Sequence, residues 1–334
     1  MTTIYLGIDA GNSKTVALAC LASGKVAGAA RAGCGDIYGA PGEAAAVATV
    51  LGAVDSALAD AGAERRDVAS AAFRLAGVDW PEDRQFWDEV LTAEWPGPTR
   101  SILNDGYAAI RCGEPSGVGV AVNAGTNAAI AARGPDGTTW DMSWWGQHAM
   151  GAFGLVTEAL KAAFLAEIDA APATALGPAL LDFYGLPDLT ELNRWFTRRR
   201  NPADPGAERP RAARVVTEAA RQGDPVAVDI VREQGRRLAF YAEVAARHAG
   251  LRDTGALIPV VLSGSILMEP DSVVAAALSE QLERLLPGAD PRRAVLPPAA
   301  GAALDALAEG GVAVGPAVAG RLAATIPPPS FFRT

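Results

Sequence analysis

The sequence is poor in the residues that mark metal-rich, disulfide-bonded or nucleic-acid-binding proteins. Its 334 residues include two histidines and three cysteines, Cys20, Cys34 and Cys112. Three widely spaced cysteines form neither a C-x-x-C metal motif nor an even-numbered disulfide framework. Acidic residues outnumber basic residues by 38 to 29, and the net charge of −9 argues against a broad surface for nucleic acids or anionic membranes.

Long hydrophobic runs and targeting patterns are also missing. No uninterrupted apolar run reaches the length of about 18 residues that a membrane-spanning helix needs. The chain enters a strand pattern directly at Ile4, without the basic region and cleavage motif of a signal peptide. We therefore expect a cytoplasmic protein with reduced thiols, and neither nucleic acid nor a membrane as its partner.

What is present is the composition of an ordinary globular protein. Half of the residues are hydrophobic and a fifth are charged. A chain of 334 residues is long enough for two domains. Lysine is scarce (Lys14, Lys25 and Lys161), so a lysine in a turn is harder to explain as a random surface residue.

The first strong pattern is a predicted β-hairpin. The apolar strand from Ile4 runs into Asp9, a small polar turn follows, and a second apolar strand leaves from Thr15. The glycine of the turn permits close approach of a ligand, and N–H, hydroxyl and ammonium groups suit phosphate oxygens. Asp9 could hold the Mg²⁺ that accompanies a nucleotide. Taken alone, an ordinary surface hairpin is the simpler explanation. The residues predicted to contact phosphate are Gly11, Asn12, Ser13, Lys14 and Thr15.

A second hairpin repeats this plan later in the chain. Strands are predicted over Val118–Asn123 and Ala128–Arg133, with a small polar tip between them. The repeat is one of layout rather than of residue identity, and it predicts two similar α/β lobes facing each other. The change of unit falls near Gly113–Gly117, so we expect one lobe over residues 1–113 and the other over residues 114–334.

A candidate catalytic acid follows the short predicted strand Ser101–Leu103. Asn104 and Asp105 come next, and a helix is predicted from Gly106. A carboxylate at such a junction can accept a proton from a substrate hydroxyl and align its oxygen. The commonest role of Asn-Asp before a helix is to cap that helix. The flanking turns, taken in order, favour catalysis by Asp105 over capping.

In this order and spacing, the motifs resemble those of the actin-like ATPase superfamily, which includes sugar kinases. Within it the chain resembles the N-acetylglucosamine kinase group, also called the BadF/BadG/BcrA/BcrD ATPase family. Gly7-Ile-Asp-Ala-Gly-Asn-Ser-Lys-Thr15 looks like its first phosphate loop, Asn123-Ala-Gly-Thr-Asn127 like its second, and Asn104-Asp105 like its catalytic pair. The segments Val260–Ser265 and Pro298–Ala303 resemble its adenosine-contacting turn and final helix.

The resemblance implies a fold and an activity. The fold would be α/β, with two actin-like (ribonuclease H-like) lobes, a nucleotide cleft between them, and a final helix packing back on the first lobe. The activity would be transfer of the γ-phosphoryl group of ATP, with Mg²⁺, to a hydroxyl of a small sugar, with Asp105 as base. By resemblance, the second phosphate loop supplies Gly125, Thr126 and Asn127, and adenosine meets Ser263, Gly264, Ser265 and Gly301.

Departures from the family pattern concern the acceptor. The Gly-Asp-Glu-Gly-Ser of the hexosamine kinases reads here with Ala152, Phe153 and Leu155 in place of Asp, Glu and Ser. Losing two carboxylates removes hydrogen-bond acceptors, so we expect an altered acceptor pocket. Asp36 stands where the family has an asparagine. The predicted substrate-binding residues are Gly35, Asp36, Asn104, Asp105, Trp145, Gly146, Gln147 and His148.

Other functions stay open on the sequence. One is an ATPase that activates an acyl-CoA dehydratase or reductase, although the chain has no cysteine pair suited to its iron–sulfur cluster. A sugar kinase with a zinc motif would need a Cys/His cluster that the sequence lacks. A sugar- or nucleotide-binding sensor without turnover is favoured by the lost Asp-Glu pair. The expected partner is a small sugar or sugar-like molecule and, at most, a second copy of the chain in a homodimer.

Overall fold

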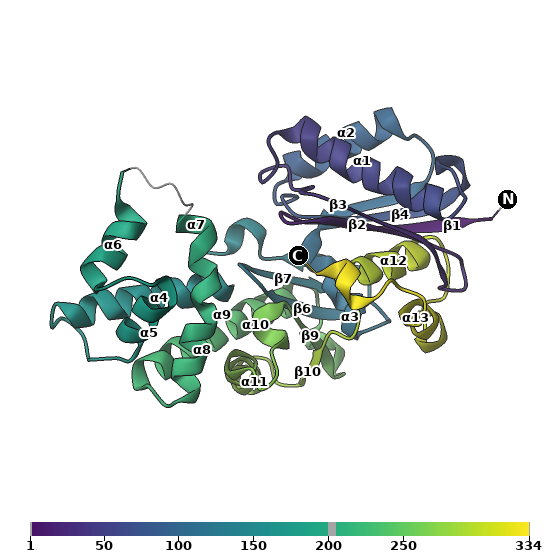
Figure 1. Ribbon diagram of the computed structural model, residues 1–334. Coiled ribbons are helices and arrows are strands. Elements are labelled where there is room, and N and C mark those ends of the chain that lie inside the picture. Colours follow the sequence, from purple (N-terminus) through teal and green to yellow (C-terminus); the bar gives the residue numbers. More distant parts are fainter. Residues whose placement is uncertain (1, 200–204, 334) are drawn as a thin grey trace.

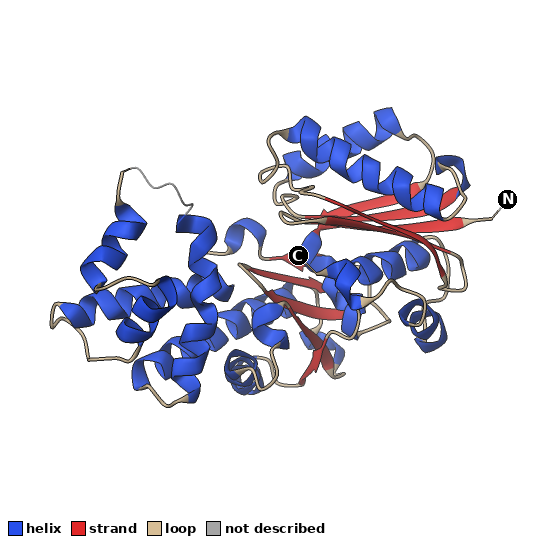
Figure 2. Ribbon diagram, in the orientation of Figure 1, coloured by secondary structure: helices blue, strands red, loops and turns tan. Residues whose placement is uncertain are grey.

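The computed structural model describes residues 2–199 and 205–333, and within them it contains two five-stranded sheets, each with helices on its faces (Figures 1 and 2). The α/β class predicted from the sequence is confirmed. No helix of these residues combines the length and the apolarity needed to cross a bilayer.

The first sheet is built around the first hairpin. Its central strand β1 runs antiparallel to β2 and parallel to β4, and β5 runs parallel to β4. Alternate side chains of β1 point to opposite faces, so Leu6 and Ile8 face one core while Tyr5 faces another. In sheet order the strands are β3 (Val26–Ala32), β2 (Thr15–Cys20), β1 (Ile4–Ala10), β4 (Val68–Leu75) and β5 (Thr99–Asn104).

Helices α1 (Glu43–Asp60) and α2 (Pro81–Glu94) pack on the Leu6 face of the first sheet. Helix α12 (Pro298–Glu309), which comes from the far end of the sequence, packs on the opposite face. A Cβ at Gly7 would overlap the backbone of Ala303, so β1 needs a glycine where α12 lies against it. α12 is not the last helix, because α13 (Pro316–Ala323) and a 3₁₀ turn (Pro329–Phe332) follow it.

The second sheet repeats the first. Read from β8 it has the same strand order, with a central strand β6, an antiparallel hairpin partner β7, and a parallel neighbour β9. The repeat of two similar lobes predicted from the sequence is confirmed by this strand order. The strands are β8 (Thr139–Asp141), β7 (Ala128–Arg133), β6 (Gly119–Ala124), β9 (Ile258–Ser263) and β10 (Ala289–Arg293).

Helices α9 (Pro225–His248) and α11 (Val273–Leu285) cover one face of the second sheet. The other face is covered by a 3₁₀ segment (Asp105–Ala109) and α3 (Ile110–Gly113), where the chain passes from the first sheet to the second. The predicted domain boundary at residues 113 and 114 falls just after α3 and stays a proposal.

A block of helices separates β8 from α9 and lies beside the second sheet, away from the first (Figure 1). Helix α4 begins at Gly151. The residues that replace the family's acids, Ala152 and Phe153, therefore lie in the first turn of a helix. The helices of the block are α4 (Gly151–Glu167), α5 (Leu176–Tyr184), α6 (Leu189–Thr197), α7 (Pro205–Glu208) and α8 (Ala213–Arg221).

A buried ion network joins the two lobes through α12. Asp305, only 1 % exposed, accepts hydrogen bonds from Arg74 of β4 at 2.7 Å and from Arg133 of β7 at 2.8 Å. Arg111 of α3 donates a third, at 2.6 Å. Burial alone would raise the pKa of Asp305, but the three guanidinium charges outweigh it and hold this pKa well below its usual range.

Candidate active site

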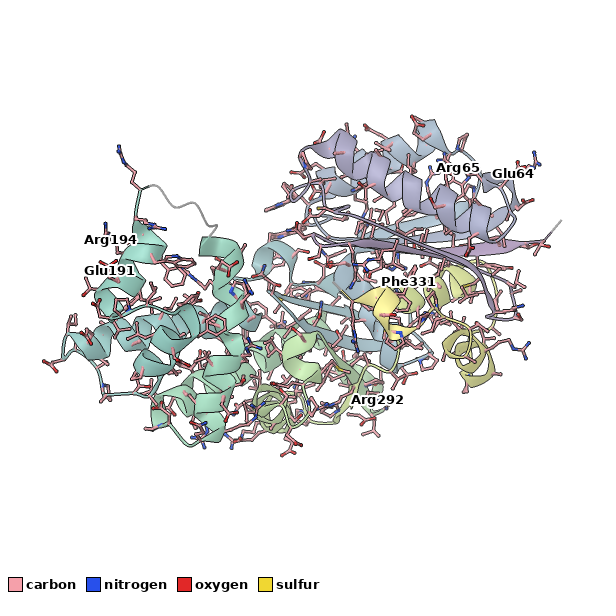
Figure 3. The ribbon with its side chains drawn as sticks, in the orientation of Figure 1. Glu64, Arg65, Glu191, Arg194, Arg292 and Phe331 are labelled. Atoms are coloured by element: carbon pink, nitrogen blue, oxygen red, sulfur yellow. The ribbon has the colours of Figure 1, made fainter. Side chains whose placement is uncertain are left out.

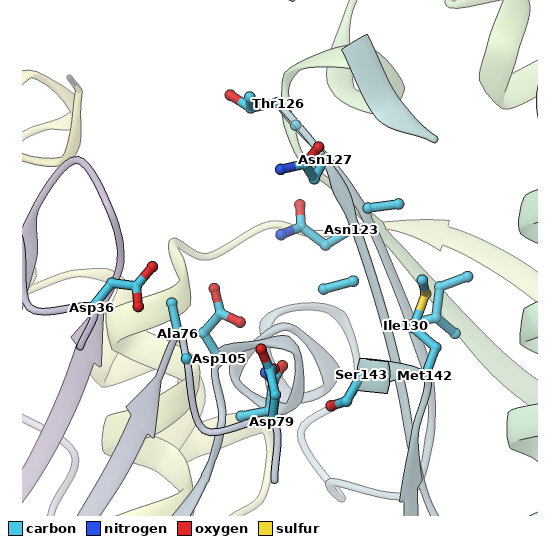
Figure 4. A pocket seen from close by; sticks show the side chains of 15 residues that line it. Asp36, Ala76, Asp79, Asp105, Asn123, Thr126, Asn127, Ile130, Met142 and Ser143 are labelled. Atoms are coloured by element: carbon cyan, nitrogen blue, oxygen red, sulfur yellow. The ribbon is translucent and has the colours of Figure 1, made fainter. Parts of the chain in front are cut away.

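The two lobes enclose a cavity of about 360 Å³ between the ends of the first-sheet strands and the second hairpin (Figure 4). Its first-lobe wall comes from the loops after β3, β4 and β5, because parallel strands end at the same edge of a sheet. Its second-lobe wall comes from β6, β7 and the loop after β8. The polar residues that line it are Asp36, Asp79, Asn104, Asp105, Asn123, Thr126, Asn127 and Ser143.

The two residues of the Asn104-Asp105 pair have different roles. The Asn104 side chain caps the 3₁₀ segment, with its Oδ1 accepting from the Gly106 N–H at 2.9 Å. The cap role that competed with catalysis is thus filled by Asn104, and the Asp105 carboxylate faces the cavity (Figure 4). Burial, and then the charges of Asp79 and Asp36, raise the pKa of Asp105 to about 6.

Asp79 is a site residue that the sequence interpretation missed. It follows β4 as Asp105 follows β5, and its Oδ1 accepts a hydrogen bond from the Asn104 amide at 2.9 Å. Burial first, and then the neighbouring carboxylates Asp83, Asp141 and Asp36, raise the pKa of Asp79. The signal that could have found it is the Gly77-Val-Asp79 turn after a predicted strand.

In the first hairpin, the Gly11 N–H donates to the Lys14 carbonyl at 2.8 Å, and the Gly11 carbonyl accepts from the Gly35 N–H at 3.1 Å. Asn12 and Ser13 are exposed at the tip, and the half-buried Lys14 donates its Nζ–H to the carbonyl of Phe332.

Thr15 is not placed as predicted. Its hydroxyl is fully buried, has no hydrogen-bond partner among the described residues, and lies so close to Gly35 that a Cβ there would overlap it. The hydroxyl therefore does not face the phosphate side of the hairpin.

Asp9 fits the role of a magnesium ligand. Burial, and then the charge of Asp105, raise the pKa of Asp9 to about 7, and the charge of Lys14 offsets part of this rise. No group of three His, Cys, Asp or Glu side chains in the described residues could hold a metal alone. Mg²⁺ typically takes one or two carboxylates and completes its shell with water and phosphate oxygens, so this donor set suits it.

The second hairpin is fastened to the start of α4. The Gly125 N–H donates to the Asn127 carbonyl at 3.0 Å, and the carbonyl of Gly125 accepts from the Ala152 N–H at 2.9 Å. The Thr126 carbonyl accepts from the Phe153 N–H at 2.9 Å. The backbone thus links the phosphate turn to the segment that departs from the family pattern.

The loop predicted to contact the substrate, Trp145–His148, packs against Tyr241 of α9. Gly146, Gln147 and His148 do not line the cavity; the Gln147 N–H donates to the Tyr241 hydroxyl at 2.9 Å, and His148 packs edge-on to that ring. Trp145 is 56 % exposed.

Neighbouring aromatic residues have clearer positions. Trp144 stacks on Trp80 of the first lobe, with ring centroids 4.5 Å apart, so this aromatic pair connects the lobes. The Phe153 ring lies under the guanidinium of Arg209, 5.2 Å away, rather than in the cavity.

A second cavity, of about 860 Å³, adjoins the predicted adenosine turn. Ser265 lines it together with Arg211 and Arg214 from the helical block. Gly264 has φ +85° and lies against the backbone of Ala124, which places this turn beside the second hairpin.

The other two predicted adenosine residues face inward. The Ser263 hydroxyl is buried and has no partner among the described residues. Gly301 is also buried, and it lies so close to the Ala108 carbonyl that a Cβ there would overlap it. Its place is in the packing of α12 against the 3₁₀ segment, so the predicted contact with adenosine has no support.

Comparisons with known proteins agree with this architecture. The model of the BadF/BadG/BcrA/BcrD ATPase family matches residues 6–306. A candidate N-acetylglucosamine kinase from Chromobacterium violaceum superposes with a TM-score of 0.64 at 24% identity, covering 92% of this chain and 99% of that one. One from Porphyromonas gingivalis gives 0.61 at 17%, covering 89% and 96%.

A ROK hexokinase from Thermus thermophilus is similar in fold, with a TM-score of 0.51 at 17% identity, covering 92% of this chain and 97% of that one. No curated protein matches the sequence. These likenesses establish the two-lobed actin-like fold that the sequence predicted.

Proposed function

Because the chain belongs to the BadF/BadG/BcrA/BcrD ATPase family, we propose that it transfers the γ-phosphoryl group of ATP to a hydroxyl of a small sugar or sugar-like molecule. One observation carries this proposal: Asp105 faces the cavity that the second hairpin lines, while Asn104 takes over the capping role. An acid that is not needed to cap a helix is free for chemistry.

Asp105 acts as the general base. Phosphoryl transfer depends mainly on positioning and charge neutralisation, so the base has to align the acceptor oxygen and take its proton as the new bond forms. With a pKa of about 6 the carboxylate is ionised at neutral pH and is still basic enough to receive that proton.

The two hairpins hold the phosphates from opposite lobes. In the first, the exposed tip and Lys14 present N–H and ammonium donors. In the second, Gly125 permits the close approach of a phosphate, and Thr126 and Asn127 present donors without a charge. Asp9 would hold Mg²⁺, directly or through water; when bound, the ion supplies neutralisation of charge on the phosphate oxygens.

The acceptor lies against the carboxylates of the first lobe. Asp36 and Asp79 accept hydrogen bonds from hydroxyl groups, and a cavity of about 360 Å³ is large enough for a monosaccharide. Since Ala152 and Phe153 replace the family's acids, the preferred acceptor differs from N-acetylglucosamine.

A coupled ADP-release assay over amino sugars, hexoses and cyclitols tests this function. Asp105→Asn should lower acceptor-dependent turnover by about 10²- to 10⁴-fold, the usual worth of a general base. Asp229→Asn, at a side chain that is 81% exposed, is the matched control and should stay at the wild-type rate. ATP turnover that needs no acceptor and is unaffected by Asp105→Asn would contradict the proposal.

A sensor that binds sugar or nucleotide without turnover is the second candidate. It is favoured by the Phe153 ring, which packs against Arg209 where the kinases carry an acid. Ligand binding by calorimetry without ADP release for any acceptor in the panel would support it.

A further inference from the structure

The segment Ile326–Arg333 crosses from the first lobe to the nucleotide side of the cleft. It starts at the end of α13, where the Ile326 N–H donates to the Leu322 carbonyl at 3.0 Å. Phe331 and Phe332 then pack against the apolar cluster formed by β2 and α12. Phe331 lies where the two lobes meet (Figure 3), and the chain ends between them (Figure 1).

This segment takes the place of a ligand at the first hairpin. The Lys14 ammonium donates to the backbone carbonyl of Phe332, although Lys14 belongs to the turn that presents donors to phosphate. Burial lowers the pKa of Lys14, partly offset by the charge of Asp9, so this ammonium has lost water that an acceptor must replace. The Phe332 carbonyl is that acceptor.

One residue further on, the segment reaches the second lobe. Arg333 lines the cavity of about 860 Å³ together with Ser265, Arg211 and Glu269. Residues 326–333 therefore extend over the first hairpin as far as the cavity beside the predicted adenosine turn. A nucleotide with its phosphates at Lys14 and its base near Ser265 would have to share this space.

We propose that residues Pro329–Arg333 form a strap that competes with the nucleotide for Lys14 and has to leave this side chain when the phosphates bind. The proposal rests on nucleotide binding at the first hairpin, which is part of the proposed function. A phosphate oxygen carries charge and the Phe332 carbonyl does not, so the ammonium binds phosphate more strongly and the nucleotide displaces the strap. The displacement lowers the apparent nucleotide affinity.

Calorimetric titration with a non-hydrolysable ATP analogue and Mg²⁺ tests the strap in four proteins. These are the wild type, a chain that ends at Pro328, Lys14→Met, and the shortened chain carrying Lys14→Met. The shortened chain should bind the analogue roughly tenfold more tightly, the scale of one hydrogen bond to a charged group. With Lys14→Met in both chains, shortening should change the affinity less than about twofold, because the contested group is gone.

Hydrogen exchange on the full-length wild type gives a second measurement that removes nothing from the fold. The Phe331 N–H, which donates to the Pro328 carbonyl at 2.9 Å, should exchange faster when the analogue saturates the protein. Slower or unchanged exchange at Phe331 would contradict displacement.

The outcomes separate the strap from the function. Wild-type binding that shortening leaves unchanged or weakens overturns the strap, and the kinase proposal stands. Tighter binding on shortening, without acceptor-dependent turnover in any of the proteins, supports the strap and overturns the kinase.

Discussion

The two hairpins that face each other across the cleft share a backbone and differ in charge. In each, the N–H of the leading glycine closes the turn: Gly11 donates to Lys14 and Gly125 to Asn127, at 2.8 and 3.0 Å. In each, the carbonyl of that glycine accepts an N–H from the segment that follows the third strand of its sheet. Gly35 donates in the first lobe and Ala152 in the second.

The side chains are not repeated in the same way. Asp9 is the penultimate residue of β1, and Asn123 is the penultimate residue of β6, so an acid in one lobe matches an amide in the other. The first hairpin also carries Lys14, whereas the tip of the second has only Thr126 and Asn127. The two hairpins thus share one backbone arrangement but carry side chains of different charge. Under the proposed function, the charged groups of the first lobe and the neutral donors of the second would contact the same phosphates.

Removing the acid breaks this division and should have the largest effect. Asp9→Asn gives the first lobe the residue type of the second and takes away the carboxylate proposed for Mg²⁺. We expect turnover to fall about 100-fold or more, the usual loss when an electrostatic partner of the transition state is removed. A Mg²⁺ titration of ADP release measures it, with Asp229→Asn as the control. Turnover within tenfold of wild type would show that the Asp9 carboxylate is not needed for the reaction.

Adding a methyl group close to the hydrogen bond that the Gly11 or the Gly125 carbonyl accepts should have an intermediate effect. The loss of stability should be larger in the second lobe than in the first. Gly151 has φ +71°, and a Cβ there would lie 2.7 Å from the Asn127 carbonyl oxygen, so Gly151→Ala should destabilise the fold by about 2 kcal/mol. Gly35 has no such backbone strain, and a Cβ there would crowd only side-chain atoms, the Thr15 Oγ1 at 2.4 Å and the Ala10 Cβ at 2.9 Å. Gly35→Ala should therefore cost less, about 1 kcal/mol.

Urea denaturation of both variants measures these free energies of unfolding. Gly52→Ala is the matched control: it lies mid-helix with open space around its Cβ position, and should stabilise by about 0.5–1 kcal/mol. Equal costs at Gly35 and Gly151 would mean that the lobes hold their hairpins equally tightly.

A pH series on the ligand-free protein should give the smallest effect and report the charge difference directly. The pKa of Asp9 is raised from 3.8 to about 7, so the folded state holds this proton more tightly than the unfolded chain does. The stabilisation from Asp9 is complete below about pH 4 and is lost as the pH rises through about 7. The melting temperature should therefore fall by a few degrees between pH 5 and 8.

Asp9→Asn should flatten this pH dependence, whereas Asn123→Ala in the second lobe should leave it in place. Differential scanning fluorimetry of the three proteins measures the slopes. A fall of the melting temperature with pH that is as steep in Asp9→Asn as in the wild type would contradict the assignment of this pH dependence to Asp9.

The sequence predicts well those features that depend only on residues close together in the chain. Alternating apolar residues around a small polar turn gave both hairpins, and a strand followed by Asn-Asp gave Asp105. These signals are local, because strand period and turn chemistry are fixed by neighbouring residues. The order of such signals along the chain was enough for the two-lobed fold.

Positions that depend on distant partners were missed or misplaced. Gly301 has the sequence environment of a helix start, yet it is buried because α12 lies against Ala108. The loop at Trp145–His148 contacts Tyr241 of α9 and does not line the cavity. Nothing local in the sequence links Lys14 to Phe332, or Asp305 to Arg74, since each contact spans most of the chain.

The position of helix α12 limits how the two lobes can be separated into independent fragments. It belongs to the sequence of the second lobe, but it covers a face of the first sheet. Its Asp305 forms ion pairs with Arg74 of the first sheet and Arg133 of the second. Cutting the chain after Gly113 would therefore give an amino-terminal fragment with a bare apolar sheet face, on which Arg74 has lost its counter-ions Asp305 and Glu309. We expect such fragments to be insoluble alone and to recover nucleotide binding only when produced together. A split-reporter design based on this protein would thus have a low background from its separate halves.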